Sequence, residues 1–201
     1  MESTSYTNIV ETSIVNALHG ESKITEDSQI VGMSGIQNRH FYNNLFGMDN
    51  ATYLVVGVGD GSALCGAMIG NSSRIFCIDG SVNSLMSMLN KYKGMNTLTE
   101  IEGDWRLVDG KTFPMFDVLV YNSGKDDTEQ SVYGVLKKFS GFMKDQYVLV
   151  VENWNIETVR NGVNGAISEL GLLKEYSREI FTPGDEFPTW WNGMFVVNLM
   201  K

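Results

Sequence analysis

The stretch at residues 53–61, YLVVGVGDG, constrains the fold of this chain more than any other part of it. Its first four residues form a continuous apolar run, typical of a strand buried on both faces of a parallel sheet. Gly57, Gly59 and Gly61 follow directly, and the apolar pattern of residues 62–69 predicts a helix. Glycines at alternate positions between a strand and a helix permit a tight turn and let backbone N–H groups approach a ligand.

A second apolar run, residues 74–78, predicts another buried strand and ends at Asp79, 22 residues after Gly57. A carboxylate at this distance is where a nucleotide-binding α/β unit hydrogen-bonds ribose hydroxyls. Strand, glycine turn, helix, strand and acid in this order favour a nucleotide-like ligand. A sharp turn without a ligand is the alternative interpretation of the glycines taken alone.

Composition restricts the partners. The chain has 201 residues, which suits one domain with a sheet covered on both faces. Its net charge of −9 and lack of a basic run argue against nucleic acid or a membrane surface as partner, because both need a positive face. Cys65 and Cys77 fall within a predicted helix and strand and are expected to be buried thiols. With no signal peptide and no apolar run of roughly 18 residues, we expect a cytoplasmic protein.

Helical and strand patterns alternate along the chain. Helices are expected at residues 6–18, 34–45, 62–69, 81–92, 129–143 and 158–170, and Ser34 is expected to open the second of them with a capping box. Strands are expected at residues 53–56, 74–78, 97–101, 116–121, 147–151, 172–181 and 194–199. The last two strands have no helix between them, so we expect an antiparallel hairpin.

These elements predict an α/β fold with a Rossmann-like, doubly wound, mostly parallel seven-stranded sheet and a C-terminal antiparallel hairpin. Residues 1–47 are expected to form N-terminal helices that act as a lid or cap of the same domain. Residues 48–201 are expected to form the Rossmann-like part.

Four features together resemble the class I S-adenosylmethionine-dependent methyltransferases: MSGIQNRHFYNNL (33–45), YLVVGVGDG (53–61), Asp79 and VVENWN (150–155). The resemblance covers roughly residues 30–201. More narrowly, the chain looks like small methyltransferase-like proteins, many of them virus- or phage-encoded, near the macrocin O-methyltransferase type.

The resemblance assigns the parts of the cofactor to particular residues. It implies that the glycine turn, Gly57, Gly59 and Gly61, holds the methionine part and that Asp79 holds the ribose. It also implies that the adenine lies against Gly103, Asp104 and Trp105. Asn122, at the carboxyl end of the fourth predicted strand, is expected to belong to the same cofactor site.

The reacting groups are expected at the carboxyl ends of the fourth and fifth strands, where open α/β sheets bind ligands. Glu152 is the candidate general base for a hydroxyl acceptor; alternatively, it caps the next helix. Lys125 is a second catalytic candidate that would orient an acidic substrate; alternatively, it is a solvated loop lysine. Asn122, Glu152 and Asn153 could supply oxygens to a divalent cation, but with one carboxylate such a site would be weak, so we expect none.

Two further groups carry open alternatives. Arg39 and His40 would face the cofactor if their helix is a lid; otherwise they form a surface pair. The aromatic side chains form either a wall for a flat or sugar-like acceptor or a packing or subunit surface; they are Trp154, Phe187, Trp190 and Trp191.

The predicted function is S-adenosylmethionine-dependent methyl transfer, to the hydroxyl of a small metabolite or sugar-like acceptor. Val55, where the family generally has an acid, motivates an alternative, together with Asn122 and Lys125. This alternative is a non-catalytic relative that acts through ligand binding or subunit interaction, and a homo-oligomer stays open. A NAD(P)-dependent oxidoreductase is less favoured, because its Gly-x-Gly-x-x-Gly pattern would need a glycine in place of Ser62.

Overall fold

The structure is a computed structural model that describes residues 5–122, 128–183 and 189–201. In this part of the chain, seven strands form one sheet in the order β3-β2-β1-β4-β5-β7-β6. The strands are β1 (Thr52–Val56), β2 (Arg74–Asp79), β3 (Thr97–Glu102), β4 (Phe116–Tyr121), β5 (Met143–Glu152), β6 (Leu173–Ile180) and β7 (Met194–Met200).

Strands β1 to β5 run parallel, whereas β7 lies antiparallel between β5 and β6. The predicted fold class is therefore confirmed, including the C-terminal antiparallel pair. Because β1, β2 and β4 are neighbours in the sheet, their carboxyl ends lie together at one edge. This edge includes the glycine turn that follows β1.

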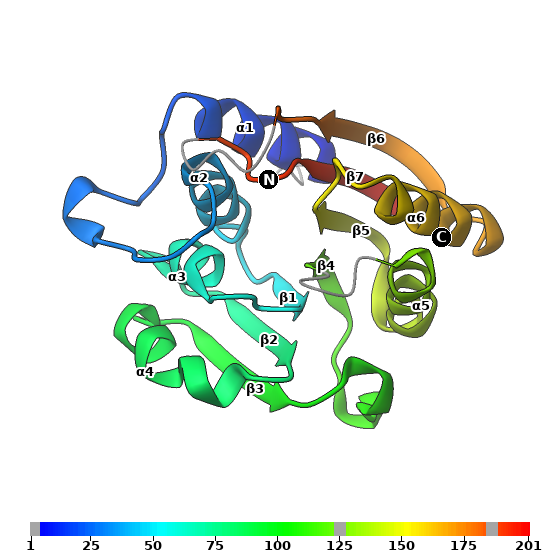
Figure 1. The fold of residues 1–201 in the computed structure, drawn as a ribbon, viewed down its shortest axis with the longest axis horizontal. Helices are drawn as coiled ribbons and strands as arrows, with labels where there is room; N and C mark the ends of the chain where they lie inside the picture. The colour runs from blue at the N-terminus through cyan, green and yellow to red at the C-terminus, as the bar shows by residue number, and fades with distance from the viewer. Residues whose placement is uncertain (1–4, 123–127, 184–188) are drawn as a thin grey trace.

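Helices cover both faces of the sheet (Figure 1). Helices α1 (Tyr6–Leu18), α2 (Ile36–Leu45), α3 (Ser62–Met68) and α4 (Val82–Tyr92) lie on one face. Helices α5 (Glu129–Phe139) and α6 (Glu157–Glu169) lie on the other. No helix in the described ranges is both long and apolar enough to cross a membrane.

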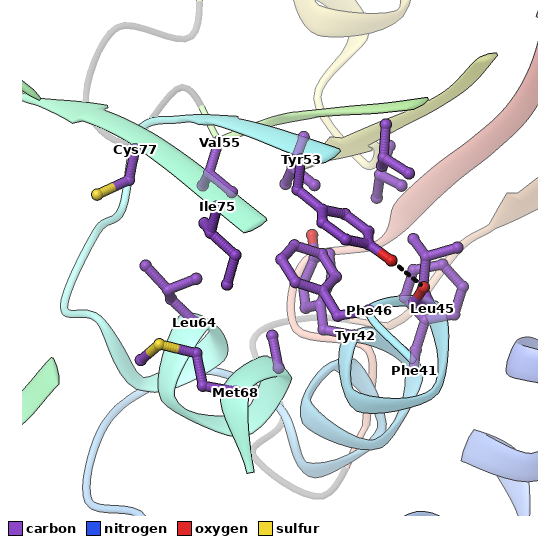
Figure 2. Close-up of a cluster of buried hydrophobic side chains, with 14 of the residues drawn as sticks. Phe41, Tyr42, Leu45, Phe46, Tyr53, Val55, Leu64, Met68, Ile75 and Cys77 are labelled. Carbon is purple, nitrogen blue, oxygen red and sulfur yellow. Dashed lines mark hydrogen bonds between the residues drawn. The ribbon is translucent and has the colours of Figure 1, made fainter. Parts of the chain in front are cut away.

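Helix α2 packs directly on the sheet. Figure 2 shows the adjoining Phe46 beside Tyr53 of β1, and the Tyr53 hydroxyl donating to the backbone oxygen of Leu45. Phe41, Leu45 and Phe46 are all buried. The Phe46 ring stacks on Tyr53 with centroids 4.0 Å apart. Burial of such side chains contributes about 1.5–3 kcal/mol each. This helix is therefore an integral part of the core layer.

Two predicted boundaries were wrong. Helix α2 begins at Ile36 after the N-cap Gly35, and Ser34 forms no capping box. The Ser34 hydroxyl instead accepts a hydrogen bond from Arg39 Nε. Helix α5 ends at Phe139, and a 3-10 turn (Ser140–Phe142) leads into β5, which begins at Met143 because its first residues pair with the neighbouring strands.

Candidate functional site

The glycine turn brings the ends of β1 and β4 into close contact. Gly57 has a φ of +83°, and a Cβ at this position would lie 1.8 Å from the backbone oxygen of Asn122. The Gly57 N–H donates to Ile78 O, and the Asn122 N–H donates to Val56 O, both at 2.9 Å. Only glycine fits here, because a side chain would meet backbone atoms that the sheet holds in place.

Asp79, at the end of β2, is bound to this turn. Its Oδ2 accepts a hydrogen bond from Val58 N at 2.8 Å. Its Oδ1 accepts from both Ser81 N and Ser81 Oγ, at 2.8 and 2.9 Å. In the described part of the chain Oδ2 therefore receives one hydrogen bond, and a carboxylate oxygen has two acceptor directions. The second direction is suited to a ligand hydroxyl.

A cavity of about 310 Å³ opens at the carboxyl ends of β1, β2 and β4. This is the lower end of the size range of small-molecule sites. Five of the seven residues predicted to bind the cofactor line it, together with Gly103; they are Gly57, Asp79, Asp104, Trp105 and Asn122. The structure thus brings together residues that are spread over 66 positions of the sequence.

The other two glycines have different surroundings. Gly61 precedes α3 with a φ of +81°, and a Cβ there would lie 2.4 Å from Met88 Cε of α4. Gly59 has a φ of +60°, and its nearest neighbour would be Asn122 Nδ2 at 3.5 Å. Neither lines the 310 Å³ cavity. Gly61 therefore serves the close packing of two helices, and Gly59 faces the Asn122 amide.

One wall of the cavity comes from the turn after β3. The Asp104 side chain accepts from Arg106 N and so caps a 3-10 helix (Trp105–Leu107). The Arg106 guanidinium lies 4.8 Å from the centre of the Trp105 ring, which also packs toward Phe139 of α5. Trp105 is therefore held firmly as an aromatic wall.

Glu152, at the end of β5, is 9% exposed and accepts a hydrogen bond at each carboxylate oxygen. Tyr42 Oη donates to Oε1 at 2.7 Å, and Asn122 Nδ2 donates to Oε2 at 2.6 Å. Burial raises the pKa of Glu152 to about 7, and the charge of Asp60 acts in the same direction, while both hydrogen bonds oppose the rise. A carboxylate with a pKa near the working pH is suited to general base catalysis.

A second cavity, of about 20 Å³, lies between α2, the glycine turn and Glu152. It has room for about one water molecule. Gly57 and Asn122 line both this cavity and the larger one. Asn122 is therefore the side chain that connects Glu152 to the proposed ligand pocket.

The three oxygen donors considered for a cation are not arranged as a ligand set. Asn122 uses its amide as a donor to Glu152. Asn153, with a φ of +61°, turns its Oδ1 toward Asn192 Nδ2 at 3.1 Å. Within the described ranges, no three His, Cys, Asp or Glu side chains form a group that could hold a metal.

Several predicted residues lie elsewhere. Lys125 and Phe187 lie outside the described residues. Arg39 neither faces the cavity nor forms a surface pair, because it is 7% exposed and donates to Ile30 O and Gly32 O. His40 makes a hydrogen bond with Ser22 in the connector.

Trp154, Trp190 and Trp191 do not form the open aromatic wall considered for an acceptor. Trp154 is fully buried and stacks on Phe195 at 4.2 Å. Trp190 is also buried and meets Phe41 edge-on at 5.9 Å. Trp191 is partly exposed. The packing alternative therefore holds for Trp154 and Trp190.

Tyr42 is the site residue that the sequence reasoning missed. It lies between Phe41 and Leu45 on the buried side of α2. A tyrosine on such a face usually has a hydrogen-bond partner for its hydroxyl, and this was the available signal. The sequence could not name the partner, Glu152, which is 110 residues away.

No family model matches the sequence, and no curated protein matches it either. Solved structures do resemble it. An O-methyltransferase from Bacillus cereus in complex with SAH has a TM-score of 0.63 and 12% identity, over 100% of this chain and 93% of that one. Precorrin-6y C5,15-methyltransferase from Geobacter metallireducens has a TM-score of 0.61 and 15% identity, over 90% of this chain and 97% of that one. The O-methyltransferase TomG from Streptomyces achromogenes, in complex with SAM, has a TM-score of 0.60 and 12% identity, over 98% of this chain and 92% of that one.

The chain has a methyltransferase-type Rossmann-like fold. At 12 to 15% identity the likeness extends to the fold alone. In open α/β sheets, ligands bind outside the carboxyl ends of the strands. The 310 Å³ cavity lies at this place in the methyltransferase-type fold.

Proposed function

We propose that this protein is an S-adenosylmethionine-dependent methyltransferase that acts on a hydroxyl group. The observation that carries the proposal is the 310 Å³ cavity, which combines the glycine turn, Asp79, Asp104 and Trp105, with Glu152 reached through Asn122. The solved structures of similar fold, two of which hold SAM or SAH, support the choice of cofactor.

The residues present fit this cofactor. Asp79 Oδ2 offers an acceptor to a ribose hydroxyl, and Trp105 offers an aromatic surface to the adenine. The glycine turn leaves space for the methionine part beside Gly57 and Asn122, which both line the cavity. When bound, S-adenosylmethionine supplies an electrophilic methyl group on a sulfonium sulfur. The protein has to align the acceptor with that group, which contributes about 7–11 kcal/mol in well-oriented reactions.

Glu152 is proposed as the general base. The acceptor O–H bond breaks toward Glu152, which takes the proton. The electron pair left on oxygen would take up the methyl group that S-adenosylmethionine, held by the glycine turn and Asp79, would supply, with S-adenosylhomocysteine as the leaving group. The two hydrogen bonds to Glu152 leave acceptor directions on the carboxylate for this proton. The reaction as proposed requires no metal ion.

The acceptor is proposed to be a small metabolite or a sugar-like molecule. A net charge of −9 makes a polyanionic acceptor unfavourable. Lys125 is proposed as a second catalytic residue, which would orient an acidic acceptor. A cytoplasmic location and a homo-oligomer are part of the same proposal.

Calorimetric titration with S-adenosylmethionine and with NADH tests the proposal. We expect the first ligand to bind and the second not to. Asp79→Asn should weaken S-adenosylmethionine binding about 10- to 100-fold, because a hydrogen bond to a charged group contributes about 1.5–3 kcal/mol. Asp109→Asn is the matched control, because Asp109 likewise accepts a hydrogen bond from the backbone N–H two residues later but lies outside the cavity.

Asp79 also fixes the glycine turn, so a second variant is needed. Trp105→Leu changes the opposite wall of the cavity and should also weaken binding. The melting temperature of each variant shows whether it is folded. A folded wild-type protein that binds neither ligand would favour the non-catalytic alternative, and NADH binding would favour an oxidoreductase.

A further inference from the structure

Helix α2 reaches the proposed base through one side chain. Tyr42 is 3% exposed, and its hydroxyl lies 2.7 Å from Glu152 Oε1. The remaining carboxylate oxygen is held by Asn122 from the end of β4. Glu152 is thus held between two donors that come from different layers of the fold.

The Tyr42 hydroxyl acts as a permanent donor. Burial and the neighbouring carboxylate of Glu152 raise the pKa of Tyr42 well above its ordinary value of 10. The phenol therefore stays protonated at neutral pH. Since an ionised carboxylate can only accept hydrogen bonds, this contact favours the ionised form of Glu152.

Helix α2 is fixed on both sides of Tyr42. Three residues earlier, the Arg39 guanidinium donates to Gly32 O at 2.7 Å and to Ser34 Oγ at 2.8 Å. One residue later, Asn43 Nδ2 donates to Gly66 O of α3 at 2.8 Å. Because these contacts fix the helix, the Tyr42 hydroxyl has a defined position relative to β5.

We propose that Tyr42 is a positioning residue for Glu152, which holds Oε1 in place and keeps the carboxylate ionised near neutral pH. The proposal rests on the proposed function for the role of Glu152 as base. The contact itself is independent of that role. Among the described residues, the titratable groups that act on Glu152 are Tyr42 from α2 and Asp60 from the glycine turn.

The test is a titration of the Glu152 carboxyl carbon by NMR, on protein labelled with ¹³C at the glutamate side-chain carboxyl. Glu152→Gln identifies the signal by its loss. In the wild type we expect a pKa of about 7. In Tyr42→Phe it should rise to about 8 or above, because the loss of one donor destabilises the ionised form.

Tyr53→Phe is the matched control. Tyr53 is a fully buried tyrosine of the same core cluster, but its hydroxyl donates to Leu45 O at 3.1 Å. This variant loses the same atom from the same core and should leave the titration of Glu152 unchanged. An unchanged or lower pKa in Tyr42→Phe, or an equal rise in both variants, would overturn the proposal.

A folding defect in Tyr42→Phe would also be informative. If that variant does not fold, adding Glu152→Gln should restore folding. The amide of glutamine is neutral, so it leaves no buried charge that needs the Tyr42 hydroxyl as a donor. Failure of the double variant to fold would assign Tyr42 to packing alone. Titration with S-adenosylmethionine is measured separately, so a wild type that does not bind it would refute the proposed function and leave the result on Tyr42 standing.

Discussion

The side chain of Glu152 is both buried and ionisable, and these two properties conflict in a folded protein. A buried carboxylate loses its hydration, and this raises the pKa of Glu152 from its ordinary value of 4.5 to about 7. The folded state therefore binds a proton more tightly than the unfolded state does. The contribution of Glu152 to the stability of the folded state is therefore greatest below pH 4.5, and it is lost as the pH rises through about 7.

Glu152→Gln should therefore stabilise the protein in a pH-dependent way. At pH 8 we expect a gain of about 3 kcal/mol in the free energy of unfolding, and little gain at about pH 4.5. The Gln side chain can keep both contacts if the Asn122 amide turns over. Urea unfolding at the two pH values measures this difference. A gain that is equal at both values would mean that the effect is not electrostatic.

At this scale the sequence allowed a partial prediction. Glu152 was identified as a strand-end acid, and Asp79 by its distance from Gly57. The role of Asp79 in fixing the turn was not predicted, because two of its three donors, Val58 N and Ser81 N, are backbone groups that carry no sequence signal. The buried state of Arg39 was missed because its acceptors are mainly backbone carbonyls.

The glycine turn, as an element, is defined by how closely two strand ends approach. Gly57 and Gly171 both have positive φ, at +83° and +64°. A Cβ added to Gly57 would meet backbone atoms of Asn122, whereas a Cβ added to Gly171 would have no atom within 4 Å. This pair separates the cost of the backbone conformation from the cost of the close contact.

Gly171→Ala should lower the free energy of unfolding by about 1 kcal/mol, the cost of a left-handed residue. Gly57→Ala should cost at least about 2 kcal/mol more, because its Cβ would meet Asn122 O. It should also abolish S-adenosylmethionine binding. Urea unfolding and calorimetry measure both effects, and similar costs for the two variants would refute the argument from close contact.

Most elements were predictable because their patterns are local. The apolar runs of β1, β2 and β4 gave bounds within one residue of those observed. The capping box at Ser34 failed because its hydroxyl contacts Arg39 and Ser62. Those contacts depend on how segments far apart in the sequence pack together.

On the scale of the whole molecule, the sheet order was less accessible than its elements. The lack of a helix between β6 and β7 predicted their antiparallel pairing. The position of β7 between β5 and β6 depends on which strands pair most favourably with β5, and no local sequence pattern indicates this. The same holds for α2, which the sequence predicted as part of a lid or cap. No local pattern indicated that its Tyr42 would lie beside Glu152.

The sharing of Asn122 between the two cavities has a consequence for ligand discrimination. S-adenosylmethionine carries a positive sulfonium, whereas S-adenosylhomocysteine is neutral at sulfur. A negative charge on Glu152 attracts only the former, and by linkage the cation lowers the pKa of Glu152. Calorimetry at about pH 6 and pH 8 should therefore show the affinity ratio of methyl donor to spent donor rising severalfold with pH, to about tenfold at most. A constant ratio would mean that the carboxylate does not sense the sulfonium. Where the ratio does rise, binding of S-adenosylmethionine favours the ionised form of Glu152. The charge of the methyl donor then sets the protonation state of the proposed base.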